Sequence, residues 1–150
     1  MVETTLIILK PDAVQRQLMG RIIARFEDKG LQVVGAKLMR ITEDLAGKHY
    51  AEHEGKPFYA GLVKFMTSNP VLVLAIRGDE AIEVCRRLLG KTNGIEADPG
   101  TIRGDFGLSK GYNLVHGSDS AKSAKRELEL FFTKDEIHTY EQTVGAWITE

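Results

Sequence analysis

The chain has 150 residues, of which 43% are hydrophobic and 27% charged, and its formal net charge is −1. These values are typical of one globular domain spanning residues 1–150, and they give no field strong enough to attract nucleic acid or an acidic membrane surface. The longest apolar run, Val71 to Ile76, is far shorter than the ~20 residues of a membrane span. Because no signal-peptide pattern opens the chain and Cys85 is the single cysteine, we expect a reducing, cytoplasmic location.

The first half of the chain predicts two strands and three helices. The apolar side chains of Met19, Ile22, Ile23 and Phe26 fall on one helical face, and Thr42 has the character of an N-cap. The predicted elements are a strand over Thr4–Leu9 that stops in a turn at 10–12, a helix from Met19 ending at Gly30, a strand over Leu31–Ile41, a helix from Thr42 to about His53, and a short helix over Phe58–Met66.

The second half predicts two more strands and two more helices around a long loop. These elements are a strand over Pro70–Arg77 buried on both faces, a helix opened by Gly78 and Asp79, a loop from Gly90 to Gly111, a strand over Tyr112–Val115, a helix opened by Ser118 and Asp119, and an irregular tail over Thr133–Glu150. The loop contains six glycines, and a loop of that length inside one domain usually has a function. In the tail, Trp147 and Ile148 are the expected anchors against the body or a neighbouring copy.

The order of these elements predicts the fold. Two βαβ-like halves arranged around four strands are typical of an α+β sandwich of the ferredoxin-like split βαβ type. We therefore expect a four-stranded antiparallel sheet covered by helices.

His116 is the most informative candidate for chemistry. A histidine beside a strand is more often structural, but this one is followed by Gly117, which leaves its ring open to approach, and by a helix start suited to anions. Imidazole is nucleophilic when one nitrogen is free and the other is held by an acceptor. Glu127 in the next helix is the candidate acceptor, although a solvated helix carboxylate is the simpler interpretation of Glu127 by itself.

A set of cations accompanies this histidine. Lys10 ends the first strand, Arg86 flanks a helix, and Arg103 lies in the glycine-rich loop. Each one alone is most simply a solvated surface charge, but together they offer the donors that phosphoryl oxygens need. Thr92 and Asn113 could add neutral donors.

Aromatic and histidine residues elsewhere give weaker signals. Phe58 and Tyr59 allow two interpretations, core packing or a ring stacked on a base, and the residues alone favour the core. His49, His53 and His138 show no metal-ligand spacing with cysteines or acids, so the sequence predicts no metal site made by the protein.

At this point four segments resemble the nucleoside diphosphate kinase family. The segment Asn113–Asp119 looks like that family's active-site signature, and Thr5–Asp12 resembles its opening strand and lysine. Two further blocks, Lys56–Val63 and Pro99–Gly107, match in the same order. The resemblance extends from about Thr4 to Ile148.

The resemblance implies a ping-pong reaction between nucleoside triphosphates and diphosphates. His116 would take the γ-phosphoryl group and pass it to a second nucleotide, with Glu127 positioning the ring and Phe58 stacked on the base. By the same correspondence, the residues that contact phosphates or ribose are Lys10, Tyr50, Arg86, Thr92, Arg103 and Asn113. Mg²⁺ would accompany the nucleotide without a protein cage.

Three positions depart from the commonest pattern of the family: Asn69, Tyr59 and Gly94. The loop that contains Gly94 helps to build trimer contacts in hexameric members. The chain length and the segment Trp147–Ile148 are similar to hexameric members, so the resemblance favours a homo-hexamer over a tetramer.

Two other functions compete with this one. A nucleotide-binding or protein-interaction module of the same fold would have little turnover, and it would not need His116 together with Lys10, Arg86 and Arg103. A phosphocarrier that hands phosphate from His116 to a protein would not need Phe58 or contacts to ribose.

Overall fold

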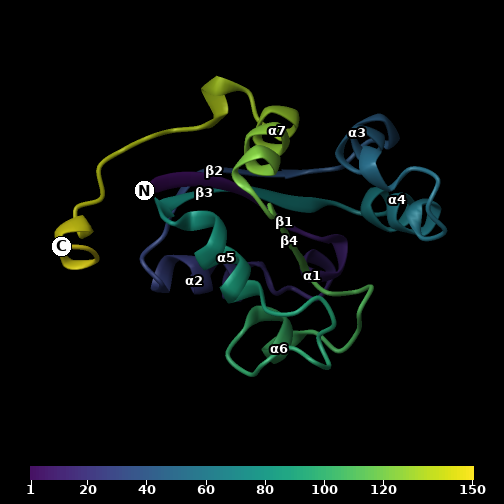
Figure 1. Ribbon diagram of the computed structural model, residues 1–150, viewed down its shortest axis with the longest axis horizontal. Helices are drawn as coiled ribbons and strands as arrows, with labels where there is room; N and C mark the ends of the chain where they lie inside the picture. The colour runs from purple at the N-terminus through teal and green to yellow at the C-terminus, as the bar shows by residue number, and fades with distance from the viewer.

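A single antiparallel sheet forms the centre of the computed structural model, which describes all residues from Met1 to Glu150. Its strands are β1 (Val2–Leu9), β2 (Gln32–Met39), β3 (Val71–Asp79) and β4 (Val115–Gly117), in the order β2-β3-β1-β4. Every neighbouring pair is antiparallel, so β1 and β2 run parallel with β3 between them. The predicted fold class, a ferredoxin-like split βαβ sheet covered by helices, is confirmed (Figure 1).

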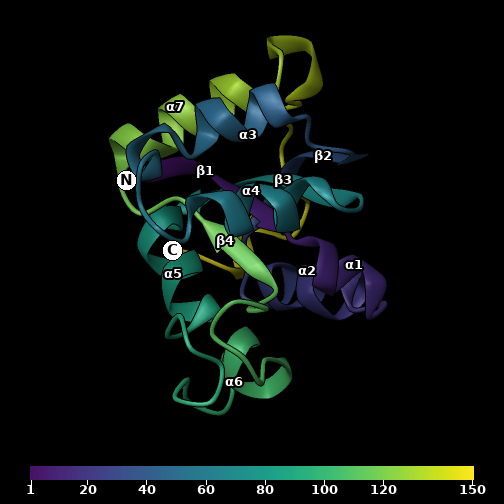
Figure 2. The same ribbon diagram turned by 90° about the vertical axis from the view of Figure 1, so that its right-hand side faces the viewer.

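Helices cover both faces of the sheet (Figures 1 and 2). On one face lie α1 (Pro11–Gln15), α2 (Met19–Asp28), α5 (Ala81–Leu89) and α6 (Ile102–Phe106), and on the other lie α3 (Glu43–His49), α4 (Tyr59–Thr67) and α7 (Ala121–Phe131). Three short 3₁₀ turns follow α3 and α7, over Ala51–His53, Lys134–Glu136 and Gly145–Trp147. None of these helices is long and apolar enough to cross a bilayer.

The strand β1 explains why the sheet has two cores. Successive side chains of a strand point to opposite faces, so Leu6 and Ile8 join the cluster under α3 and α7, whereas Ile7 and Leu9 join the cluster under α2 and α5. All four are completely buried, which accounts for the nearly continuous apolar sequence of this strand.

Several element boundaries differ from the predicted ones. The expected turn after β1 is the short helix α1, because Pro11 occupies its first turn, where the missing N–H costs no hydrogen bond. The strand β3 continues through Gly78 to Asp79, which pairs with Val2, and Glu80 then adopts a left-handed conformation before α5 begins. The helix α3 ends at His49 and not at about His53, although Thr42 caps it as predicted.

The most consequential shift concerns β4, which covers Val115–Gly117 and not the predicted Tyr112–Val115. Leu114 has a φ of +73°, so an extended conformation cannot begin before Val115. His116 therefore lies within the strand. The next helix, α7, is capped by Ser120, whose side chain accepts a hydrogen bond from the Ser123 N–H, and not by Ser118 or Asp119.

The long loop contains the helix α6, which the sequence analysis left as loop. Thr101 caps this helix by accepting a hydrogen bond from the N–H of Gly104. A Cβ at Gly104 would overlap the carbonyl oxygen of Asp98, so only glycine fits there. The five-residue helix is too short to produce a periodic signal.

The C-terminal tail meets the body along β2 and again at Gly30. The His138 N–H donates to the Val34 carbonyl over 2.7 Å, and Gln32 Nε2 donates to the Tyr140 carbonyl over 2.8 Å. Ile148 packs against Gly30, where an added Cβ would lie 2.5 Å from Cγ2 of Ile148. Trp147, by contrast, is 91% exposed, so of the two expected anchoring surfaces, the body and a neighbouring copy, the body is excluded for this residue. Its indole has no partner within this chain to bury it.

The helix α2 offers a matched pair of substitutions that tests the core. Phe26 is fully buried, so Phe26→Ala should lower the free energy of unfolding by about 3–5 kcal/mol. Gly20 is exposed in the same helix with nothing near its missing Cβ, so Gly20→Ala should raise that free energy by roughly 0.5–1 kcal/mol. Chemical denaturation measures both, and equal effects of the two substitutions would contradict this account of the core.

Candidate functional site

His116 is placed by the pairing of β4 with β1. It lies directly opposite Ile8, whose side chain faces the α3 and α7 side of the sheet, so the imidazole projects to that side as well. The backbone just before it is held by two hydrogen bonds at Leu114. The Leu114 N–H donates to Asp12 Oδ2 over 3.1 Å, and the Leu114 carbonyl accepts from the Lys10 N–H over 2.8 Å.

Arg103 fixes the same segment from the side of α6. Its guanidinium donates to three backbone carbonyls: those of Asn113 at 3.2 Å, Gly90 at 3.0 Å and Val115 at 2.6 Å. These bonds tie the start of β4 to the end of α5 and to α6. Arg103 therefore supports the backbone around His116 as well as adding positive charge, a task that the sequence analysis did not assign to it.

The ring of His116 is oriented by Glu127. Nε2 lies 2.7 Å from Glu127 Oε1, and the Ser118 hydroxyl donates to the same oxygen over 2.9 Å. Burial alone would raise the pKa of the Glu127 carboxyl, but the bonds from His116 and Ser118 outweigh it and lower that pKa. An ionised Glu127 can only accept, so Nε2 carries the ring proton and Nδ1 of the neutral imidazole keeps its lone pair.

Glu127 reaches this position because α7 turns one face toward the sheet. Ala124, Glu127 and Phe131 are the buried residues of α7, at the spacing of one helical face. The interpretation of Glu127 as a solvated surface carboxylate is therefore wrong: only 5% of this residue is exposed.

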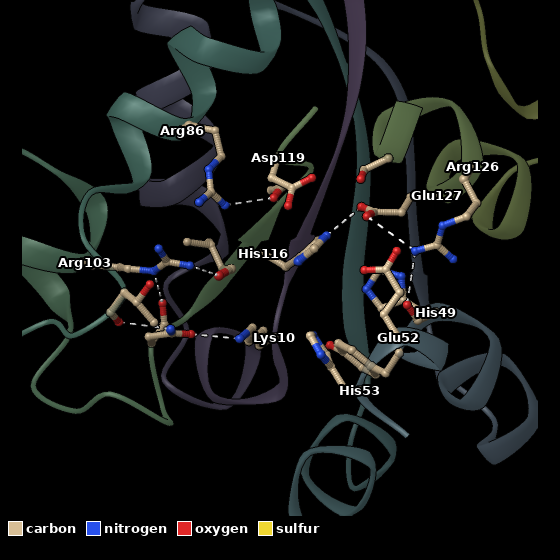
Figure 3. Close-up of a pocket in the computed structure, with 16 residues that line it drawn as sticks. Lys10, His49, Glu52, His53, Arg86, Arg103, His116, Asp119, Arg126 and Glu127 are labelled. Carbon is tan, nitrogen blue, oxygen red and sulfur yellow. Dashed lines mark hydrogen bonds and ion pairs between the residues drawn. The ribbon is translucent and has the colours of Figure 1, made fainter. Parts of the chain in front are cut away.

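The cations gather on the other side of His116 (Figure 3). The Lys10 ammonium donates to Asn113 Oδ1 over 2.8 Å, and the Asn113 amide donates to the Thr92 carbonyl over 3.1 Å. Arg86 donates to the Gly117 carbonyl over 3.1 Å. Burial and the nearby charge of Arg103 lower the pKa of Lys10 to about 8. These cations lose part of their hydration on folding. An anionic ligand would compensate for that loss by accepting charge-assisted hydrogen bonds from them.

These groups line a cavity of about 330 Å³. Eight of the nine site residues singled out from the sequence line it: Lys10, Tyr50, Arg86, Thr92, Arg103, Asn113, His116 and Glu127. They come from α5, α6, β4 and α7, and from the segments that follow β1, α3 and α5 or precede β4. Residues from so many elements meet because the carboxyl end of β1 lies beside β4. The cavity therefore combines a nucleophilic ring with a concentration of positive charge.

The ninth residue, Phe58, lines an adjoining cavity of about 700 Å³. Phe58 is 52% exposed, so core packing, the interpretation that the residues alone favoured for Phe58 and Tyr59, is wrong for Phe58. It is right for Tyr59, which is partly buried and packs against the core cluster under α3 and α7. Phe65 and Tyr112 face each other in the same cavity with ring centroids 4.9 Å apart, and Lys10 and Thr92 line both cavities. A ligand with a charged end and a flat apolar end fits this pair of compartments.

Several lining residues were missed by sequence reasoning. These are His49, Glu52, His53, Asp119, Ser123 and Arg126. Arg126 donates to the carbonyls of Lys48 over 3.2 Å and His49 over 3.3 Å, which holds the end of α3 against α7. Arg126 stands beside Glu127 in the sequence, but no local pattern indicates that its side chain reaches another helix.

His49 is the least expected of these residues. Only 5% of this residue is exposed, and neither ring nitrogen has a hydrogen-bond partner. An unpaired buried polar group costs roughly 1–3 kcal/mol. Burial, followed by the neighbouring His116, lowers the pKa of His49 to about 3, so its imidazole is neutral. Tyr50 beside it has a buried, unpartnered hydroxyl whose pKa is raised by burial.

The ligand atoms of His49, His116 and Glu127 all lie within 4.8 Å of one another. The sequence-based prediction of no metal site made by the protein did not consider this combination of residues. The three residues come from α3, β4 and α7, so no spacing along the sequence could have revealed it.

Comparisons with known proteins give one consistent result. The sequence model described as nucleoside diphosphate kinase matches residues 3–137. The chain is 56% identical over 146 residues to a nucleoside diphosphate kinase of Bacillus licheniformis, covering 97% of this chain and 99% of that one, and 55% identical over 141 residues to one of Methanobrevibacter smithii, covering 94% of each. A solved structure of the Halobacterium salinarum enzyme in complex with CDP superimposes with a TM-score of 0.98 at 49% identity, covering 100% of both chains.

Lys10 allows a direct test of the electrostatics of the cavity. One lysine should titrate at about 8 instead of 10.5, because burial disfavours the ammonium. Sulfate, a dianion throughout this range, should bind more weakly as the pH rises through 8 and should raise the pKa when bound, because it stabilises the charged form. NMR titration of the lysine side chains measures both effects. Lys10→Arg should remove the unusual titration, and a wild-type chain in which every lysine titrates near 10.5 would contradict the assignment.

Proposed function

Because this chain belongs to the nucleoside diphosphate kinase family and has that family's activity, we propose that His116 carries the phosphoryl group between the two nucleotides. The observation that supports this role best is the bond from Nε2 to Glu127, which leaves the lone pair of Nδ1 facing the cations. Nδ1 would attack the γ-phosphorus of the nucleoside triphosphate, and the nucleoside diphosphate would leave. A second nucleoside diphosphate would then take the phosphoryl group from Nδ1 in the reverse sense.

The other residues of the cavity have roles in phosphoryl transfer that follow from their positions around His116. Phosphoryl transfer depends on alignment and on charge around the equatorial oxygens more than on covalent help from the protein. Lys10, Arg86 and Arg103 supply that charge, while Thr92, Asn113 and Tyr50 contact phosphates or ribose. As positive charge develops on the ring during attack, Glu127 stabilises it and keeps the ring in place.

Phe58 would hold the base in the apolar cavity. Stacking on an aromatic ring uses the π-face that every base has, so this contact discriminates little between bases. The cavity that contains Phe58 adjoins the cavity of His116 through Lys10 and Thr92, as one nucleotide spanning both would require.

Mg²⁺ would enter with the nucleotide. This ion prefers six oxygen ligands and keeps several waters, and phosphate oxygens commonly complete its shell. Apart from Glu127, which is engaged with His116, the cavity offers the exposed carboxylates of Glu52 and Asp119. Two carboxylates are too few to fill the coordination shell of Mg²⁺, so phosphate oxygens and water would supply most of its ligands. The ion would in turn neutralise charge on those phosphate oxygens.

We also propose that residues 1–150 act as one domain and assemble as a homo-hexamer. The edge strand β2 pairs with no strand other than β3, and Leu38 is exposed near its end, beyond the bond that the tail makes to Val34. The loop near Gly94 exposes Ile95 and Leu108. The exposed Trp147 adds an apolar group that a neighbouring copy could cover. A cytoplasmic location agrees with the free, buried thiol of Cys85.

A labelling experiment tests the role of His116. With Mg²⁺ and ATP radiolabelled on its γ-phosphate, the protein should acquire an acid-labile label that unlabelled GDP removes as labelled GTP. His116→Ala should bind nucleotide but lose turnover by roughly 10³-fold or more, since it lacks the attacking atom. A wild-type protein that never takes label would favour a binding module, and a label that GDP cannot remove would favour a phosphocarrier.

The base contact is tested by substitution of Phe58. Phe58→Ala should weaken nucleotide binding by about 1–3 kcal/mol with little difference between purines and pyrimidines. Phe58→Tyr, which keeps an aromatic ring, is the matched control and should bind nearly as the wild type does. Calorimetric titration with ADP, GDP and CDP gives the comparison, and a loss confined to one base would argue against stacking.

Light scattering of the purified protein tests the assembly. A hexamer has six times the chain mass of 16.7 kDa. Trp147→Ser should shift the distribution toward smaller species if the exposed indole lies in an interface between copies. A wild-type mass of four chains would exclude the hexamer.

A further inference from the structure

Three potential metal ligands, one of them His116 itself, lie close together in the cavity. They are His49 at the end of α3, His116 on β4 and Glu127 on α7, and their ligand atoms lie within 4.8 Å of one another. All three line the same cavity, and His49 and Glu127 lie together on the side of the ring away from Lys10 (Figure 3). The phosphoryl-transfer role uses His116 and Glu127 but gives His49 no task.

His49 has unused coordination capacity. Its ring touches Tyr50, His116 and Phe131 edge-on, with centroids 4.4, 4.8 and 5.2 Å apart. A phenylalanine could make these contacts, whereas both imidazole nitrogens are buried and without a partner. The neutral ring therefore has a lone pair close to His116 and Glu127. A phenylalanine at position 49 would keep the ring contacts but would have no such lone pair.

We propose that His49, His116 and Glu127 form an inhibitory binding site for a divalent transition metal of the zinc class. Two imidazoles and one carboxylate, with a fourth position left to water, are a donor set that Zn²⁺ adopts in proteins. Ligand atoms in a tetrahedral zinc site lie about 3.4 Å apart. The present separations reach 4.8 Å, so metal binding at this site requires the three side chains to move closer together. Mg²⁺, which prefers oxygen ligands, would not compete well here.

The surroundings of Glu127 suit a ligating carboxylate. Ser118 donates to Oε1, the oxygen that faces His116, and Arg126 lies 3.9 Å from Oε2. Arg126 also donates to the carbonyl of His49. Such outer contacts fix the orientation of metal ligands, and here they connect two of the three proposed ligands.

A metal at this site would stop phosphoryl transfer, a consequence that rests on the proposed role of His116. For Nε2 to ligate, its proton must leave, and a neutral imidazole then carries its one proton on Nδ1. The lone pair that would attack phosphorus is no longer available. Ligation through Nδ1 would occupy that lone pair directly, so both modes of binding inhibit.

Calorimetric titration of the full chain with ZnCl₂ tests the binding. The wild type should bind one Zn²⁺ per chain at this site, and His49→Phe, which keeps the ring contacts, should weaken that binding at least tenfold. His138→Gln, an exposed histidine elsewhere, is the matched control and should leave the affinity unchanged. Equal affinities of the wild type and a folded His49→Phe variant would overturn the proposal.

X-ray absorption at the zinc edge gives a second test that needs no variant. The wild type loaded with one equivalent of Zn²⁺ should show two imidazoles among its ligands and no sulfur. A single imidazole, or a thiolate from Cys85, would place the metal elsewhere and overturn the site.

Labelling then separates the metal site from the proposed catalytic role. The zinc-loaded wild type should take up radiolabelled phosphate from ATP at least tenfold more slowly than the metal-free protein, and a chelator should restore the rate. In His49→Phe the same zinc treatment should slow labelling much less. Unchanged labelling of the zinc-loaded wild type would overturn the inhibition. A metal-free protein that never takes label would refute the role of His116 and leave the binding result standing.

Discussion

The hydrogen bond of 2.7 Å between His116 Nε2 and Glu127 Oε1 joins the edge of the sheet to α7, and the chemistry of the cavity depends on it. It determines which nitrogen carries the proton, and it also determines which side of the ring faces the cations. The carboxylate can hold this proton because it is buried yet ionised, with Ser118 as a second donor. Without that bond the ring could rotate, and the lone pair would have no defined direction.

The backbone around His116 is fixed as firmly as its side chain. Leu114 adopts a left-handed conformation that a leucine tolerates poorly, and Asp12 and Lys10 hold it there. Arg103 adds three bonds to carbonyls. These contacts connect α1 and the end of β1 with α6 and β4, so the position of His116 depends on several elements and not on one loop.

The two adjoining cavities differ in polarity. The cavity of His116 has Lys10, Arg86 and Arg103 on one side of the ring, and His49, Glu127 and Arg126 on the other. The cavity of Phe58 is largely apolar. Desolvation lowers the pKa of Lys10, and a ligand that brings negative charge would stabilise its ammonium form. The same desolvation leaves His49 neutral, which makes it a possible metal ligand and a poor contact for phosphate.

The sequence by itself determined the architecture and the family, and it named eight of the residues that line the cavity of His116. The apolar run from Thr4 to Leu9, the helical spacing up to Phe26 and the cap at Thr42 are local patterns, and each gave the predicted element. Only the tertiary structure decided the start of β4, the support that Arg103 gives to the backbone, and the meeting of His49 with His116. These features depend on contacts between elements far apart in the chain, and local periodicity contains no information on such distances. The motifs therefore identified the parts of the site, and the packing of α3 and α7 on the sheet determined which nitrogen and which oxygen face each other.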